Sequence, residues 1–312
     1  MRIIDALPPT RYAAAAAHAR TDQFKNLKAK TIKRVQQWYA DPRVNQNVAP
    51  GLWFGYGKDS MAGAVILKLA SLDFCHLTIN NGGDLPQHWL VKPEWETYFG
   101  KDFYYEEYTT DRTFPQIIRA YLNWGNIYGM RTKEGKALNF WDWGGMAESI
   151  TYEAIYQFHH LYGEGEENVM YMWSNRQGEG QERAFEIARE GMFQFHDQNK
   201  KDALPYIRAL PLGDWKDIDV WALLVSENSP ISPIYSMHQI PQKQGNKAFP
   251  RTLWYCTPEI LCSQYYKWLA FYAPVQLKEL CELFPEIQAR FTLRRKKEEG
   301  RGKKEEGRGK KG

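Results

Sequence analysis

The feature of this 312-residue sequence that most constrains its fold is an alternation of strand-type and helix-type segments between residues 50 and 227. The strand-type runs are short, apolar and rich in aromatic or β-branched residues, and they cover residues 50–54, 74–80, 102–110, 168–174 and 205–212. Helix-forming segments separate them, at residues 61–72, 146–161, the second half of 175–192, and 213–227. This alternation predicts an α/β fold with a mostly parallel sheet of about five strands.

The segments on either side differ in composition from this central part. Residues 11–40 combine Ala, Lys, Arg and Gln with spaced apolar side chains, which is typical of one or two helices. The C-terminal tail repeats KKEEGRG twice and has no apolar residue after Leu293, so it is predicted to be disordered. We therefore predict a helical segment over residues 1–45, an α/β domain with a helical C-terminal part over 46–293, and a basic tail over 294–312.

The net charge of +4 comes from this tail. Its ten Lys or Arg residues and four Glu contribute +6, which leaves residues 1–293 at −2. A nucleic-acid-binding fold needs a basic face, so the charge supports nucleic acid as a partner only weakly, through electrostatic tethering by the tail.

Other bulk properties narrow the class of protein. A hydrophobic fraction of 43% and an aromatic fraction of 15% exclude a disordered chain. No apolar run approaches 18 residues and no secretory signal opens the chain, so we expect no membrane association and a cytoplasmic location.

A glycine-rich turn, GYGKDS at residues 55–60, joins the first strand-type run to its helix. Gly55 and Gly57 allow positive φ and the close approach of a ligand to a row of main-chain amides. The helix N-terminus adds partial positive charge, Lys58 adds a full charge, and Ser60 adds a hydroxyl. The turn therefore predicts a site for phosphate or pyrophosphate.

Two common phosphate-binding patterns do not fit this turn. The Walker A pattern needs a glycine where this chain has Leu52, and a Ser or Thr where it has Asp59. The dinucleotide fingerprint lacks its third glycine, because Ser60 stands there. Loops at 80–86 and 175–182 follow two further strands, and we expect them to converge with the turn because parallel strands end at one edge of a sheet.

The turn does resemble the S-x-G-K-D-S loop of the PP-loop ATP pyrophosphatases, and within them the PAPS reductases and the ATP sulfurylase small subunits, with Gly55 in place of the Ser. LTINNGGDLP, residues 77–86, is similar to the second strand and D-T-G turn of that family, with Asn80 in place of the Asp. NRQGEGQERA, residues 175–184, resembles its R-R-x-x-x-x-S-R-A segment: it keeps Arg176, Arg183 and Ala184 and has Gln177 in place of the second Arg.

Two later stretches extend the resemblance. RALPLGDWKDIDVWALLVSENSPISPIY, residues 208–235, is similar to the P-L-x-x-W-x-x-x-D-V-W helix of the family and its P-x-x-P-L-Y turn. RTLWYC, residues 251–256, resembles the R-T-L-G-C stretch of ATP sulfurylase small subunits. The chain is thereby identified as a divergent member of the PAPS reductase family over about residues 48–258. Trp215 and Trp221 are equally explained as core aromatics.

The resemblance implies an adenine nucleotide alpha hydrolase-like, Rossmann-like fold in three layers that binds ATP or a sulfonucleotide. It implies cleavage of ATP between the α and β phosphates in adenylyl transfer to an oxyanion such as sulfate, with Mg²⁺ accompanying the nucleotide. Lys58 and Arg176 are implied as catalytic cations. The nucleotide-binding residues it implies are Gly55, Tyr56, Gly57, Lys58, Asp59, Ser60, Asn80 and Gly82. Asp59 is alternatively explained as a cap of the helix that follows.

Three alternative functions stay open. A sulfonucleotide reductase attacks with the cysteine of a C-terminal E-C-G-L-H segment, which this chain lacks. The four cysteines fit no paired-cysteine site, so no iron–sulfur cluster is expected, and Cys281 in the helical LKELCELF is predicted to be buried and inert. The second alternative is a nucleotide-binding subunit that needs a catalytic partner, and the third is a component of nucleic-acid sulfur modification.

Overall fold

The computed structural model describes residues 7–80, 89–109, 154, 157–160, 168–196, 205–238, 274–283 and 285. The predictions made for Gly82, for the stretch 251–256 and for the tail 294–312 lie outside these residues. The chain divides into two compact units, of which the first comprises residues 1–112, 140–239 and 250–255 and contains the sheet.

The second unit comprises residues 113–139, 240–249 and 256–312, and it contains helix α13 (Pro274–Leu283). This helix carries Cys281, whose side chain is half-buried rather than buried as predicted. Burial raises the pKa of the Cys281 thiol, which agrees with the expected low reactivity.

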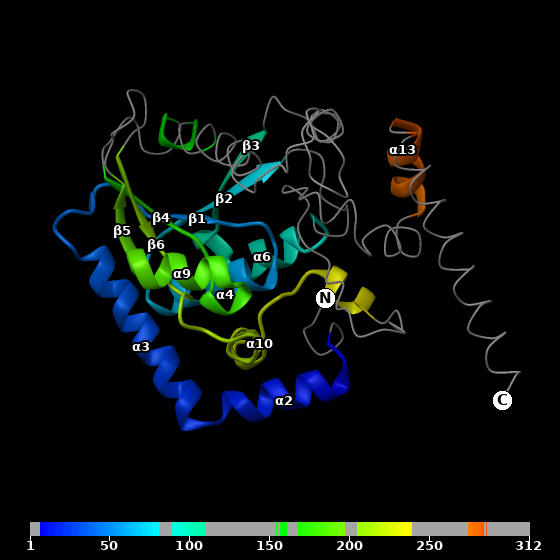
Figure 1. Ribbon diagram of the computed structural model, residues 1–312, viewed down its shortest axis with the longest axis horizontal. Helices are drawn as coiled ribbons and strands as arrows, with labels where there is room; N and C mark the ends of the chain where they lie inside the picture. The colour runs from blue at the N-terminus through cyan, green and yellow to red at the C-terminus, as the bar shows by residue number, and fades with distance from the viewer. Residues whose placement is uncertain are drawn as a thin grey trace, which may run out of the picture. The chain divides into compact units, whose positions relative to one another are not determined.

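Six strands form one sheet in the order β3-β2-β1-β4-β6-β5 (Figure 1). They are β1 (Gly51–Trp53), β2 (Cys75–Asn80), β3 (Tyr104–Thr109), β4 (Val169–Met172), β5 (Phe193–His196) and β6 (Tyr206–Ala209). All neighbouring pairs are parallel except β5 and β6, which are antiparallel. The predicted α/β class and mostly parallel sheet are therefore confirmed.

The edge strand β5 is absent from the sequence-based prediction, which expected about five strands. Two residues, Gly191 and Met192, separate it from helix α9 (Gln181–Glu190), and Gly191 has a positive φ of 81°. A left-handed glycine at this position ends the helix and turns the chain. Phe193 and Phe195 alternate with polar residues, and this period-two pattern is the sequence feature that indicates a strand here.

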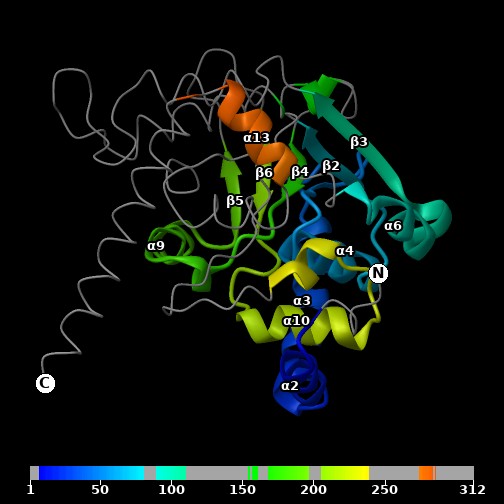
Figure 2. The ribbon, with the colours of Figure 1, turned by 90° about the vertical axis from the view of Figure 1, so that its right-hand side faces the viewer.

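Helices are stacked in succession on one face of the sheet. Helix α4 (Lys58–Leu69) contacts β1, α10 (Asp217–Ser226) contacts α4, and α2 (Pro9–Ala19) contacts α10, an order visible in Figures 1 and 2. Helix α3 (Asp22–Tyr39) contacts α4 beside them. The remaining short helices are α6 (Lys92–Phe99), η1 (Gly100–Asp102), η2 (Gln177–Glu179) and η3 (Pro233–His238).

The opposite face of the sheet is covered by helical residues 154 and 157–160, which fall within the helix predicted at 146–161. Phe158 is fully buried there, with its ring centroid 5.6 Å from Trp53 and 6.1 Å from Tyr108. Helices thus lie on both faces of the sheet and give the three-layer architecture. No helix within the described ranges has the length and apolarity needed to cross a membrane.

Helix α4 lies close to the sheet because a glycine faces it. A Cβ atom built on Gly63 would stand 2.4 Å from Ser174 Oγ and 3.4 Å from Leu52 Cδ1. A side chain at this position would require Ser174 to shift, so glycine suits this close approach. The contact holds the N-terminus of α4 beside the ends of β1 and β4.

Candidate functional site

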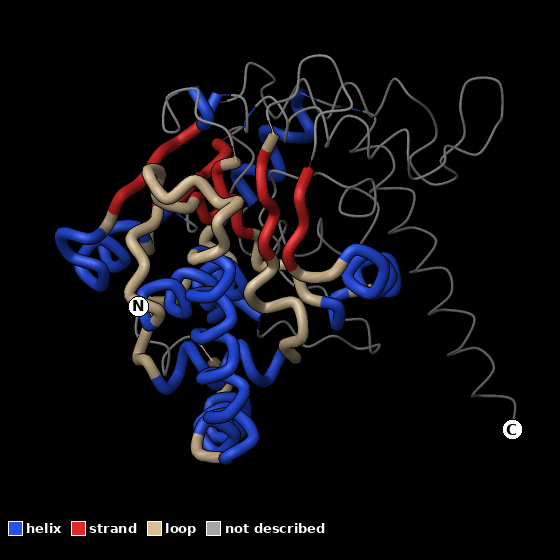
Figure 3. The backbone as a smooth tube through the Cα atoms, turned by 90° about the vertical axis from the view of Figure 1, so that its left-hand side faces the viewer, coloured by secondary structure: helices blue, strands red, loops and turns tan. Residues whose placement is uncertain are grey.

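The predicted phosphate turn lies where the strand order of the sheet reverses. β1 pairs with β2 on one side and β4 on the other, so successive strands are added in opposite directions from this point. The chain leaves β1 into α4 and leaves β4 into η2 and α9. Figure 3 shows the strands in red and the helices in blue, with the connecting loops in tan. Ligands of open α/β sheets bind at such a switch point, outside the carboxyl ends of the strands.

The backbone of the turn differs from the prediction. Gly57 is the N-cap residue of α4 with a φ of −75°, and the positive φ of the turn, 52°, falls on Tyr56. Among the described glycines, positive φ occurs at Gly100 and Gly191, so the freedom that Gly55 and Gly57 have to adopt positive φ is not used at either position. A left-handed conformation costs a tyrosine about 1–2 kcal/mol, which burial of its ring offsets.

Tyr56 contributes only its main chain to the surface of the turn. Its side chain is 1% exposed, and its ring lies 4.8 Å from Phe54 and 5.5 Å from Trp89, centroid to centroid. Its predicted contact with a nucleotide is therefore restricted to backbone atoms. The half-buried Gly55 precedes it at the start of the turn.

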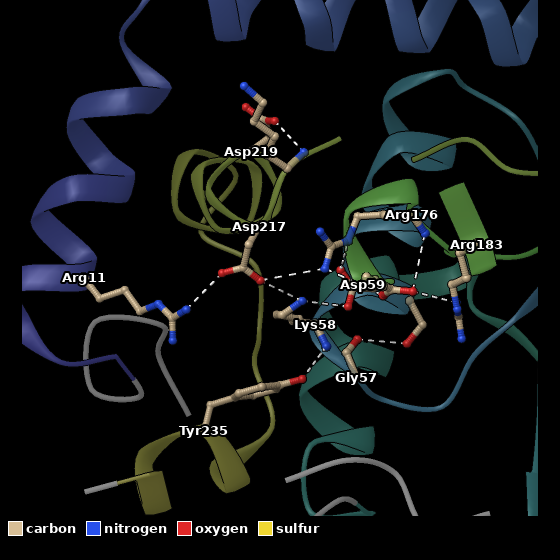
Figure 4. A network of polar contacts seen from close by, with 12 residues as sticks. Arg11, Gly57, Lys58, Asp59, Arg176, Arg183, Asp217, Asp219 and Tyr235 are labelled. Atoms are coloured by element: carbon tan, nitrogen blue, oxygen red, sulfur yellow. Dashed lines mark hydrogen bonds and ion pairs between the residues drawn. The ribbon is translucent and has the colours of Figure 1, made fainter. Parts of the chain in front are cut away.

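The amide of Lys58, the first residue of α4, has a protein partner. It donates a hydrogen bond of 2.6 Å to the hydroxyl of Tyr235, a buried residue of η3, as Figure 4 shows. Burial raises the pKa of Tyr235, so the phenol stays neutral at physiological pH. Ser60 donates its hydroxyl to the Gly57 carbonyl at 2.9 Å. Two groups of the predicted phosphate site, the Lys58 amide and the Ser60 hydroxyl, are thus already hydrogen-bonded within the protein.

Lys58 and Arg176 meet on a shared carboxylate. Lys58 Nζ lies 2.7 Å from one oxygen of Asp59, and Arg176 Nε lies 2.7 Å from the other (Figure 4). Asp59 is in the first turn of α4, where its charge also complements the helix dipole. The structure therefore brings together the two cations that the sequence analysis singled out from different loops.

Arg176 is held deep in the site, with a side chain that is only 5% exposed. Burial on its own would lower the pKa of Arg176, but the carboxylates of Asp59, Glu179 and Asp217 outweigh this effect and raise it. The guanidinium is therefore permanently charged and fixed in place.

Further charged residues surround this pair and were missed by the sequence analysis. Glu179 contacts Arg176 at 3.6 Å and Arg183 at 2.6 Å. Asp217, at the start of α10, contacts both site cations and Arg11 of α2. The spacing of Glu179 at i+3 from Arg176 was an available signal, whereas nothing local points to Arg11.

Of the second predicted loop, residues 80–86, the structure describes only Asn80, which lies at the same edge of the sheet because β2 is parallel to β1 and ends there. The Asn80 side-chain amide donates to Glu107 of β3 at 2.8 Å. This bond orients Asn80 toward the neighbouring strand.

The described residues do not form a site of their own for the Mg²⁺ that the resemblance implies. In the described part of the chain, no three His, Cys, Asp or Glu residues gather as metal ligands. Asp59 and Asp217, the carboxylates nearest Lys58, are both paired with cations. Mg²⁺ is therefore predicted only as an ion carried by the phosphates of a nucleotide.

Comparisons with known proteins give remote structural likenesses. No protein-family model matches the sequence, and no curated protein matches it. NMN synthetase from Francisella tularensis aligns with 66% of this chain and 71% of its own at 11% identity and a TM-score of 0.42. Candida glabrata FMN adenylyltransferase in complex with FAD and inorganic pyrophosphate aligns with 76% of this chain and 72% of its own, at 15% identity and a TM-score of 0.42.

A third likeness is to phosphoadenylyl-sulfate (PAPS) reductase from Candida auris in a phosphate complex. It covers 59% of this chain and 75% of the reductase, at 11% identity and a TM-score of 0.35. Likenesses this remote assign neither a family nor an activity, and the fold class rests on the strand order itself.

Proposed function

We propose that this chain binds the polyphosphate of ATP at the turn 55–60 and transfers the adenylyl group to a small oxyanion. The supporting observation is that Lys58 and Arg176, from the loops after β1 and β4, converge on Asp59 at the switch point of the sheet. Adenine as the base and sulfate as the first acceptor to test come from the resemblance of the turn to PP-loop enzymes.

In the proposed reaction, an oxygen of the acceptor attacks the α-phosphorus of ATP. The new oxygen–phosphorus bond forms as the bond to the α–β bridging oxygen breaks, and pyrophosphate leaves with the electron pair. Lys58 and the N-terminus of α4 stabilise the charge that develops on the leaving group. The planar guanidinium of Arg176 suits two-point contact with the acceptor oxyanion.

The proposal is tested by exchange of labelled pyrophosphate into ATP in the presence of sulfate, selenate or another oxyanion. Lys58→Met removes the ammonium but leaves Asp59 paired with Arg176, so the melting temperature is expected to change little. Exchange should fall by about 100-fold or more, which is typical of losing a charge-stabilising group. Lys25→Met is the matched control, because Lys25 is an exposed lysine of α3.

The outcomes separate the alternatives. Equal exchange in the wild type and in Lys58→Met would contradict the proposal, as would the absence of any ATP binding. Binding of ATP that depends on Lys58, without exchange for any acceptor, would instead favour a nucleotide-binding subunit that needs a catalytic partner.

A further inference from the structure

One carboxylate of the site is held differently from the others. Asp217 Oδ1 lies 3.1 Å from Lys58 Nζ and 3.8 Å from Arg176 Nη2, and its Oδ2 accepts a hydrogen bond of 2.9 Å from Arg11 (Figure 4). Three cations from three separate segments thus surround a single carboxylate. A phosphate or sulfate group needs a similar set of partners.

Asp217 is also the carboxylate of the site most open to solvent. Its side chain is 46% exposed, against 23% for Asp59 and 24% for Glu179. Asp59 makes contacts of 2.7 Å with both Lys58 and Arg176, whereas the contacts of Asp217 with the same two cations are longer. A ligand that arrives from solvent therefore meets Asp217 first, and Asp217 is the carboxylate held less tightly.

Arg11 is positioned on the same side of the site. Its guanidinium lies 5.4 Å from the ring centroid of Trp221, a core residue of α10. The same guanidinium donates a hydrogen bond to the carboxylate of Asp217. The ring contact places the Arg11 charge beside the position of the Asp217 carboxylate, so Arg11 can bond an anion that takes that position.

We propose that Asp217 is an internal competitor that occupies the position of a ligand oxygen between Lys58, Arg176 and Arg11, and that an incoming anion must displace it. This inference rests on the proposed function and adds a residue that determines affinity and selectivity. Burial tends to raise the pKa of Asp217, but Lys58, Arg11 and Arg176 outweigh this effect and lower it, so the competitor is ionised at neutral pH. An anion that replaces it must bring more charge, which favours pyrophosphate over singly charged anions.

The test is calorimetric titration of inorganic pyrophosphate into the full chain. Removing a competing carboxylate removes like-charge repulsion, so Asp217→Asn is expected to bind pyrophosphate about tenfold tighter than the wild type. Asp217→Ser serves as a second variant, because Ser keeps a residue suited to a helix N-terminus without the charge. Glu227→Gln, the same charge change at the other end of α10, should leave the affinity unchanged.

A double variant tests Arg11. In the Asp217→Asn background, Arg11→Gln is expected to cancel most of the gain in affinity, because Arg11 then no longer contacts the bound anion. Unchanged or weaker binding in both Asp217 variants, with Lys58→Met still abolishing it, would overturn this inference and leave the proposed function standing. If neither the wild type nor any of the variants bound pyrophosphate, both this inference and the proposed function would be overturned.

Discussion

Asp217 and Asp219 stand two residues apart in the first turn of α10, yet they have different partners. Asp217 faces the cations of the site, whereas Asp219 is buried, accepts the Lys216 amide at 2.7 Å and lies 2.6 Å from Nε2 of His18. Asp219 therefore caps α10 and joins it to α2. Of the two, Asp217 is the one that contacts Lys58 and Arg176.

These roles predict that substitution of Asp217 changes the affinity for pyrophosphate, whereas substitution of Asp219 changes the stability of the fold. Asp219→Ala leaves the Lys216 amide and His18 without their acceptor, and should lower the free energy of unfolding by about 1–3 kcal/mol in a urea titration. Its pyrophosphate affinity should match that of the wild type wherever both are folded. Loss of affinity at unchanged stability would show that Asp219, too, belongs to the anion site.

At the scale of single elements, β2 carries a histidine in an apolar environment. His76 is fully buried, and the centroids of Phe54, Phe74, Phe99 and Phe103 lie 4.6 to 4.9 Å from its ring. Its Nδ1 lies 2.9 Å from the Tyr104 carbonyl of β3. Burial lowers the pKa of His76 from 6.5 to about 4, although the bond to Tyr104 opposes the shift. The ring is neutral in the folded protein.

This pKa predicts a loss of stability in mild acid. Below pH 6.5 the unfolded chain binds a proton at His76, whereas the folded chain binds it only near pH 4, so stability declines across this interval. The wild type should lose about 3 kcal/mol more unfolding free energy than His76→Phe between these pH values. Urea titrations at several pH values measure the difference, and parallel pH profiles would contradict it.

At the scale of the whole sheet-containing unit, helix α3 is joined to the structure by buried and partly buried polar contacts. Arg34 of α3 makes two hydrogen bonds of 2.9 Å with Asp214 and one of 2.7 Å with the Pro211 carbonyl. The indole of Trp215, which is 1% exposed, donates to Thr31 at 2.9 Å. These contacts connect α3 to the turn between β6 and α10, and they show that Trp215 is a core aromatic.

The Arg34–Asp214 pair should therefore couple the helices to the sheet. Arg34→Gln and Asp214→Asn are each expected to lower the free energy of unfolding by about 1–3 kcal/mol, and the double variant should lose less than the sum. Burial tends to raise the pKa of Asp214, but the hydrogen bond and charge of Arg34 outweigh this effect and lower it. The contribution of the pair is thus present above the ordinary pKa of 3.8 and lost as the pH falls through the lower folded-state value.

A double-mutant cycle at neutral pH measures the coupling, and a repeat at low pH should show it reduced. Strictly additive losses at neutral pH would mean that the two side chains do not act together.

Local sequence determined the elements of this protein. The α/β class, five of the six strands, an N-terminal segment of one or two helices and the glycine-rich turn before α4 follow from periodicity and composition over stretches of a few residues. The four-residue β5 was missed because it follows directly on a helical pattern, and a prediction based on local pattern extended that segment instead. Anion binding at Lys58 stays a prediction of the local sequence, since Gly, Lys and Ser at a strand-to-helix turn favour anions.

Only the tertiary structure decided what stands around that turn. Arg11 and Asp217 are 206 residues apart in sequence, and Lys58 and Tyr235 are 177 apart. Their contacts depend on the reversal of strand order between β1 and β4 and on the stacking of α2, α10 and α4. Helix and strand propensities act between near neighbours, whereas the partners of a buried charge are set by which distant elements pack against it.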